Sequence, residues 1–95
     1  MGKEEIVERD PPMLEVDAGI ALGDKYIFKG KCDPYARLQV FVNGKRWGDI
    51  DLGDDGGFQA MIPVEYDGWN TITFEAQDTY GTKNPQERKV YWSGI

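Results

Sequence analysis

Turn-forming residues recur about every ten residues along this chain, and they limit what it can fold into more than any other feature does. Turns are predicted where Gly, Pro, Asn and Asp cluster, at residues 10–12, 23–24, 33–34, 43–44, 54–57, 67–68 and 78–85. Between these clusters lie short runs in which apolar and polar residues alternate, as in strands with one buried side. No window of about 11 residues has a clean helical period. The chain is therefore predicted to be all-β, an antiparallel sandwich or barrel.

The alternation predicts about seven strands, each with one side suited to a core. These strands cover residues 13–16, 25–32, 37–42, 49–52, 58–65, 71–77 and 89–93. Their inward sides carry Tyr26, Phe28, Gly30, Cys32, Leu38, Val40, Val42, Ile50, Leu52, Phe58, Ala60, Ile62, Val64, Ile72, Phe74, Ala76, Val90 and Trp92. Residues 82–87 are predicted to form a proline-bent loop before the last strand.

Two local features refine this prediction. Asn43-Gly44 predicts a two-residue type I′ hairpin, because both central residues of that turn need positive φ. Pro63 cannot donate to a ladder, so it is expected at a sheet edge or a bulge. Lys25, Lys29 and Lys31 are expected to protect an edge together with Pro63, which predicts a monomer.

The length allows one domain, since 95 residues and 10.8 kDa lie at the lower end of single-domain sizes. Residues 1–11 are charge-rich, lack alternation and end at a double proline, so they are predicted to be a flexible leader or linker, with the domain in residues 12–95. The leader has no basic segment followed by an apolar core, so no targeting signal is expected. No run is apolar enough to predict direct membrane insertion.

Charge and composition exclude several kinds of function. The formal net charge is −6, from 17 acidic and 11 basic residues, which argues against nucleic acid as a partner. The whole excess lies in residues 49–95, with nine acids and three bases. The chain has no His and a single Cys, Cys32, so no histidine base, internal disulfide or cysteine-rich metal site is expected. Cys32 is predicted to be buried as a small apolar residue, a reactive thiol being the alternative.

Several short motifs occur in a fixed order: Phe28-Lys29-Gly30, Asp33-Pro34-Tyr35-Ala36, Val40-Phe41-Val42-Asn43-Gly44, Asp55-Gly56-Gly57-Phe58 and Gly68-Trp69-Asn70 continuing to Asp78. In this order they resemble bacterial immunoglobulin-like repeats, and are most similar to the type found in domain B of glucodextranase and in many surface-protein repeats. The resemblance covers residues 26–92, with a departure at Thr82, where the repeats often carry Asn. It implies a seven-stranded Greek-key sandwich and no catalytic or cofactor residues.

The acidic run from Asp49 to Gly57 is the part of this sequence that comes nearest to a metal-binding loop. It fails the EF-hand template, because Gly53 and Ala60 stand where acidic ligands are needed. A looser Ca²⁺ site could use Asp54 and Asp55, joined by Asp78 if the loops converge. The alternative is that these acids stabilise turns and keep strand faces hydrated. No metal or other cofactor is therefore predicted, and these three aspartates are the candidate ligands for such a Ca²⁺ site.

Aromatic residues near predicted turns are the candidate ligand-binding residues. Trp47 follows the Asn43-Gly44 hairpin, Trp69 lies in the turn that begins at Asp67-Gly68, and Tyr80 lies in the turn after Asp78. Exposed rings can stack on sugars or anchor a protein interface. The alternative is that they cap the ends of the sandwich.

Two main functional hypotheses follow. The first is a non-catalytic immunoglobulin-like module of a larger bacterial surface or secreted protein, located extracellularly or in the cell envelope, that acts as a spacer or as a protein-interaction domain. Its partners would be neighbouring domains of the parent chain, and either a protein or a polysaccharide. The second is a carbohydrate-binding accessory module of a polysaccharide-active enzyme. A third is an enzyme subdomain whose carboxylates act only within the parent chain, because a small sandwich offers no deep catalytic cleft of its own.

Overall fold

Residues 10–93, the part of the chain that the computed structural model describes, form eight β-strands and no helix. The strands are β1 (Leu14–Val16), β2 (Ile20–Leu22), β3 (Lys25–Cys32), β4 (Arg37–Val42), β5 (Lys45–Ile50), β6 (Gly57–Pro63), β7 (Gly68–Gln77) and β8 (Lys83–Trp92). The predicted all-β sandwich is confirmed, with β2 as an additional strand. The described residues contain no helix that could cross a membrane. Most of the predicted leader, residues 1–9, lies outside the described part of the chain.

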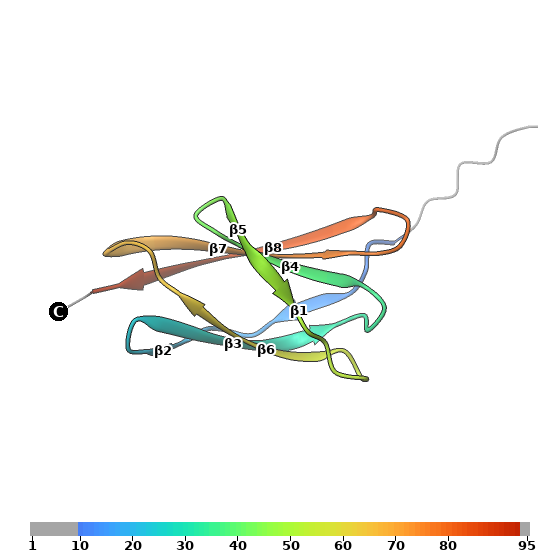
Figure 1. The fold of residues 1–95 in the computed structure, drawn as a ribbon, viewed down its shortest axis with the longest axis horizontal. Coiled ribbons are helices and arrows are strands. Elements are labelled where there is room, and N and C mark those ends of the chain that lie inside the picture. The colour runs from blue at the N-terminus through green and yellow to red at the C-terminus, as the bar shows by residue number, and fades with distance from the viewer. Residues whose placement is uncertain (1–9, 94–95) are drawn as a thin grey trace, which may run out of the picture.

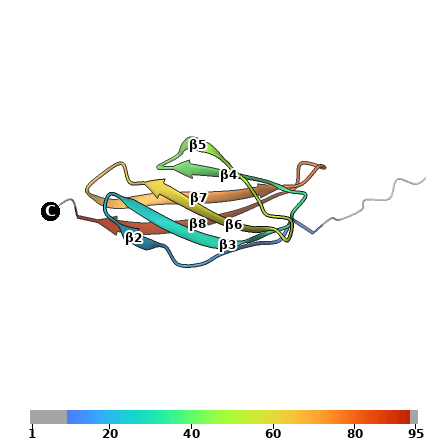
Figure 2. The same cartoon turned by 60° about the horizontal axis from the view of Figure 1, so that its bottom comes forward.

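The strands form two antiparallel sheets that pack face to face (Figure 1). In the first sheet, β3 is central: β6 pairs along one of its edges, and β1 and β2 share the other. The second sheet has the order β5-β4-β7-β8. Figure 2 shows β3 and β6 side by side in one layer, with β7 and β8 forming part of the layer behind them. The chain therefore passes repeatedly from one sheet to the other.

The core lies between the sheets and consists of the sides that alternation predicted to be buried. Phe28 of β3 packs edge-on against Phe74 of β7, with ring centroids 5.1 Å apart, and Phe58 of β6 contacts the same ring at 6.0 Å. The buried apolar residues are Leu14, Val16, Phe28, Cys32, Ala36, Leu38, Val40, Val42, Phe58, Ala60, Ile62, Ile72, Phe74, Ala76 and Val90. Tyr26, Ile50, Leu52 and Val64 pack against them while partly buried.

The prediction of a loop at residues 82–87 is wrong, because β8 begins at Lys83 and pairs with β7 over its full length. Pro85 is tolerated since β8 is the outermost strand of its sheet. The inward side of β8 begins with polar residues because it meets the backbone of the N-terminal segment. Asn84 donates to the carbonyl oxygen of Pro12 at 2.9 Å, and Arg88 donates to that of Val16 at 2.8 Å. A polar inward side has no apolar alternation, so the sequence pattern did not reveal the strand.

The edge predictions are confirmed for Pro63 and wrong for the lysines. Pro63 ends β6, which among the described strands pairs with β3 alone and so lies at a sheet edge. Lys25, Lys29 and Lys31 lie on β3, which has partners on both edges. They project from the outer face of the sheet, where they are exposed, and do not guard an edge.

The predicted hairpin is present, with positive φ of 51° at Asn43 and 84° at Gly44. Beyond it, one extra residue decides which side of β5 faces the core. Trp47 has no partner in the β4–β5 register, so it is the extra residue of a β-bulge. A regular ladder from this turn would pair Leu38 with Asp49, but the bulge pairs Leu38 with Ile50. Ile50 therefore reaches the core and Asp49 faces outward.

The bulge predicts opposite effects of shortening and lengthening β5. Deleting Trp47 should leave Ile50 opposite Leu38 and cost about 1 kcal/mol, mainly from lost side-chain contacts. Inserting one Ala after Trp47 should shift the register again, turn Asp49 inward and cost about 2–4 kcal/mol. Urea unfolding of the two variants measures both costs. A deletion that costs more than the insertion would contradict this account of the bulge.

Candidate functional site

The three candidate aromatic residues lie in three different settings. Trp47 lines a groove beside β6, and its side chain is 44% exposed. Trp69 is 66% exposed and packs edge-on against Tyr91, with ring centroids 5.3 Å apart. Tyr80 lines a cavity of about 320 Å³ together with Tyr35 and the segment 10–12, where the described chain enters the sandwich. The predicted aromatic residues therefore do not share one binding surface.

The groove at Trp47 lies between β5 and β6, each of which has one edge that no other strand in residues 10–93 pairs with. It has a volume of about 290 Å³ and is lined by Val42, Lys45, Arg46, Trp47, Pro63, Val64 and Glu65. The bulge explains the position of the indole, since the extra residue of a bulge re-aims its side chain. The groove thus combines an exposed indole ring, aliphatic walls and charged groups.

A buried polar centre holds both rims of this groove. Asn70 is 1% exposed, and its Oδ1 accepts hydrogen bonds from the backbone amides of Glu65 at 3.1 Å and Tyr66 at 3.0 Å. The same oxygen accepts from Asn43 Nδ2 at 3.0 Å, while Asn70 Nδ2 donates to the carbonyl oxygen of Tyr66 at 2.8 Å. Asn43 Oδ1 in turn accepts from the amide of Thr71 at 2.8 Å. The turn that carries Glu65 and the hairpin that leads to Trp47 are therefore fixed to each other.

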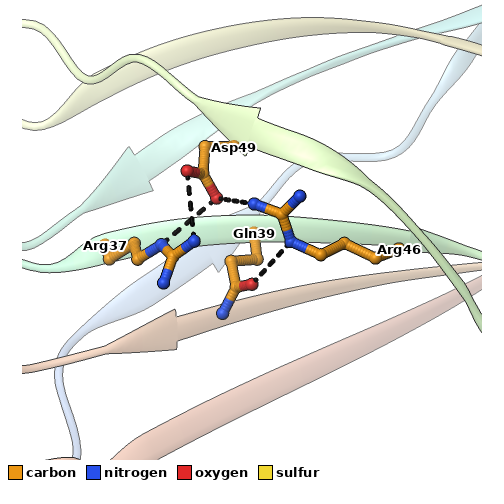
Figure 3. A network of polar contacts seen from close by, with 4 residues as sticks. All are labelled: Arg37, Gln39, Arg46 and Asp49. Atoms are coloured by element: carbon orange, nitrogen blue, oxygen red, sulfur yellow. Dashed lines mark hydrogen bonds and ion pairs between the residues drawn. The ribbon is translucent and has the colours of Figure 1, made fainter.

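A second polar network lies on the outer face of the β4–β5 hairpin (Figure 3). Arg37 binds the Asp49 carboxylate through two nitrogens, at 3.2 and 3.3 Å, and Arg46 reaches the same carboxylate at 2.8 Å. Arg46 also donates to Gln39 Oε1 at 3.1 Å, so the guanidinium group lies over the Gln39 side chain. The bond from Arg37 is the main cause that lowers the pKa of Asp49. This network holds Asp49 in the outward position that the bulge requires.

The candidate metal ligands act within their own turns. Asp55 Oδ1 accepts from the amide of Gly57 at 2.9 Å, and this bond is the main cause that lowers the pKa of Asp55. Asp78 Oδ1 accepts from the amides of Tyr80 and Thr82, both at 2.9 Å. Asp54 is exposed in the turn before β6. Within residues 10–93, no group of three or more acidic or cysteine side chains is placed to hold a metal ion, so the three aspartates do not converge.

Cys32 and Trp92 occupy the sides of their strands that were predicted to face inward. Cys32 is fully buried, and burial is the main cause that raises the pKa of its thiol, so it packs as a small apolar residue. Trp92 is half-buried, and its Nε1 donates to the carbonyl oxygen of Gly23 at 2.9 Å. Tyr26 forms a similar bond from its hydroxyl to the carbonyl oxygen of Tyr91 at 2.6 Å. These bonds join the β2–β3 turn region to β8.

Comparison with known proteins found no matching family model and no similar curated protein.

The buried centre at Asn70 can be tested by its effect on stability. Asn70→Ala should lower the free energy of unfolding by about 3 kcal/mol, because buried amides at the turn lose their acceptor. Asn84→Ala, which removes the bond to Pro12 from a half-buried side chain, should cost about 1 kcal/mol. Urea unfolding compares the two variants, and hydrogen exchange at Glu65 and Tyr66 should accelerate only in the first. Equal costs would contradict the central role of Asn70.

The Arg37–Asp49 bond predicts that the protein loses stability as the pH falls and Asp49 becomes protonated. The folded-state pKa of Asp49 is lowered, so its contribution to stability is present above the unfolded value of about 4 and is lost as the pH falls through the folded value. Arg37→Gln should therefore raise the pKa of Asp49, as measured by carboxyl NMR titration. Asp55 is the internal control, because its main partner is the amide of Gly57. An Asp49 titration unchanged by Arg37→Gln would show that this bond does not lower its pKa.

Proposed function

We propose that this chain is a non-catalytic immunoglobulin-like module of a larger bacterial surface or secreted protein, where it acts as a spacer between neighbouring domains. The strand arrangement supports the family: one sheet has β3 between β1 and β6, and the other has the order β5-β4-β7-β8. Immunoglobulin variable-type sandwiches likewise add strands to one sheet directly after the first strand of that sheet in chain order, as β5 follows β4 here. The motifs that resemble bacterial repeats lie mostly in the turns and inward positions of this sandwich.

The observation that carries the spacer function is the placement of the two ends of the described chain. Pro12 contacts Asn84 near the start of β8, and the chain leaves after Trp92 at the other end of that strand. At about 3.4 Å per residue, entry and exit lie about 27 Å apart along the strand direction. Figure 1 shows the described chain entering at one end of the sandwich and leaving at the other. Domains joined before and after the module would therefore be held apart.

The hydrogen bonds between β8 and the N-terminal half of the module support a rigid spacer. β1 runs alongside β8, with Pro12 bonded to Asn84 and Val16 bonded to Arg88. At the opposite end of β8, Tyr26 and Trp92 bond across to the backbone. A pulling force between the first and last described residues would act along β8. Hydrogen bonds fix β8 to the N-terminal half of the module near both of its ends.

Concatenated copies of residues 10–93, joined without the predicted flexible leader, test this function. The maximum dimension measured by small-angle X-ray scattering should grow in proportion to copy number, by about 30 Å or more per copy. A flexible chain would grow only with about the square root of its length. Square-root growth, or compaction of the copies against one another, would overturn the spacer proposal.

A further inference from the structure

The Trp47 groove has a chemistry that the spacer function does not use. Part of its wall is apolar: Val42 and Val64 line it together with the ring of Pro63, and the half-exposed indole of Trp47 borders it. Its volume of about 290 Å³ is near the lower end of small-ligand sites. A flat aromatic surface beside an aliphatic wall suits a ligand with one apolar face.

The rim of the groove carries balanced charge. Lys45 Nζ and Glu65 Oε2 lie 3.8 Å apart, which is too long for a strong hydrogen bond. The Glu65 carboxylate already accepts from the side chains of Tyr66, Asn43 and Lys45. A carboxylate has about four acceptor sites and an ammonium three donors, so both groups keep capacity for a ligand in the groove.

Arg46 also lines the groove, but its guanidinium is bonded to Asp49 and Gln39, so the Asp49 carboxylate offsets its charge. Lys45 and Glu65 then stand side by side as one positive and one negative group, and a ligand with a net charge of either sign would meet repulsion from one of them. The rim therefore favours a neutral ligand that both donates and accepts hydrogen bonds.

The groove is also held in shape before any ligand arrives. Glu65 is anchored through its amide to Asn70, which is bonded to Asn43 in the hairpin that precedes Lys45 and Trp47. Both rims thus belong to one hydrogen-bonded unit. A site held in this way loses less conformational freedom when a ligand binds.

An added peptide strand fits this place poorly. Strand addition needs a row of free backbone donors and acceptors along a sheet edge. Pro63 removes a donor at the end of β6, and the bulge at Trp47 interrupts the edge of β5. The groove therefore has side-chain chemistry for a ligand but a broken backbone edge.

We propose that the Trp47 groove binds a neutral saccharide. The indole stacks on the apolar C–H face of a sugar ring, and Lys45 and Glu65 hydrogen-bond to hydroxyl groups at its edge. The site would give the module an affinity for uncharged polysaccharide, and it does not depend on the spacer function, which the length of concatenated copies tests separately.

The test uses the full chain and a panel of soluble neutral polysaccharides: starch, mixed-linkage β-glucan, xylan and mannan. Binding is followed by the shift of tryptophan emission to the blue and by NMR of the three indole N–H groups. At least one polymer should bind and should move the Trp47 indole signal together with the amides of residues 45–47 and 63–65. Polygalacturonate, an anionic polymer, should bind more weakly than that neutral polymer.

Matched variants locate the site. Trp47→Ala should weaken binding about tenfold or more, while Trp69→Ala, at a more exposed tryptophan, should stay within about twofold of the unmodified chain. Trp47→Tyr keeps an aromatic ring and should retain part of the affinity, which keeps the test valid if the Ala variant does not fold. No binding by any neutral polymer, binding by polygalacturonate alone, or an equal loss in Trp69→Ala would overturn the proposal. Binding of extended peptides in place of the polymers would overturn it as well.

Discussion

The buried amide of Asn70 is the contact on which the shape of one end of this sandwich depends. An uncharged side chain with both donors and acceptors can satisfy several backbone groups at once, and Asn70 does so for the turn at residues 65–68. Its bond to Asn43 extends that order to the hairpin between β4 and β5. A polar group in the core is costly unless all its bonds are made, so the two turns can adopt only the arrangement that makes them.

The two sides of the sandwich where the edges of the two sheets lie next to each other differ in how those edges are connected. On one side, Asn84 and Arg88 of β8 donate hydrogen bonds to the backbone of the N-terminal segment. These bonds connect the edge of the second sheet to the edge of the first. On the other side, the outer edges of β5 and β6 pair with no strand of the described part of the chain; Trp47 lies in a bulge on β5, and Pro63 ends β6. Both devices discourage edge-to-edge pairing of sheets. The closed side supports a rigid module, and the open side leaves room for a ligand.

The fold could largely be predicted from the sequence, because burial of one strand side imposes an alternation that needs no knowledge of partners. Phe28, Val40 and Phe74 were placed correctly in this way. The start of β8 was missed since its inward residues meet backbone carbonyls, and such contacts leave no apolar pattern. The bulge could have been found in the sequence. A regular ladder from the Asn43-Gly44 turn places Asp49 on the inward side, whereas the apolar alternation places Ile50 there. One extra residue in β5 reconciles the turn with the alternation.

By itself, the sequence determined the all-β class, the hairpin and most of the core, since those follow from turn chemistry and from the two-residue period of a strand. It also identified Trp47, Trp69 and Tyr80 as aromatic residues near turns. Only the tertiary structure decided that these three rings lie apart, that Trp47 borders a groove with Lys45 and Glu65, and that Asp54, Asp55 and Asp78 do not converge. The physical reason is that such contacts join residues far apart in the chain, and their geometry depends on how strands pair and where a register shifts.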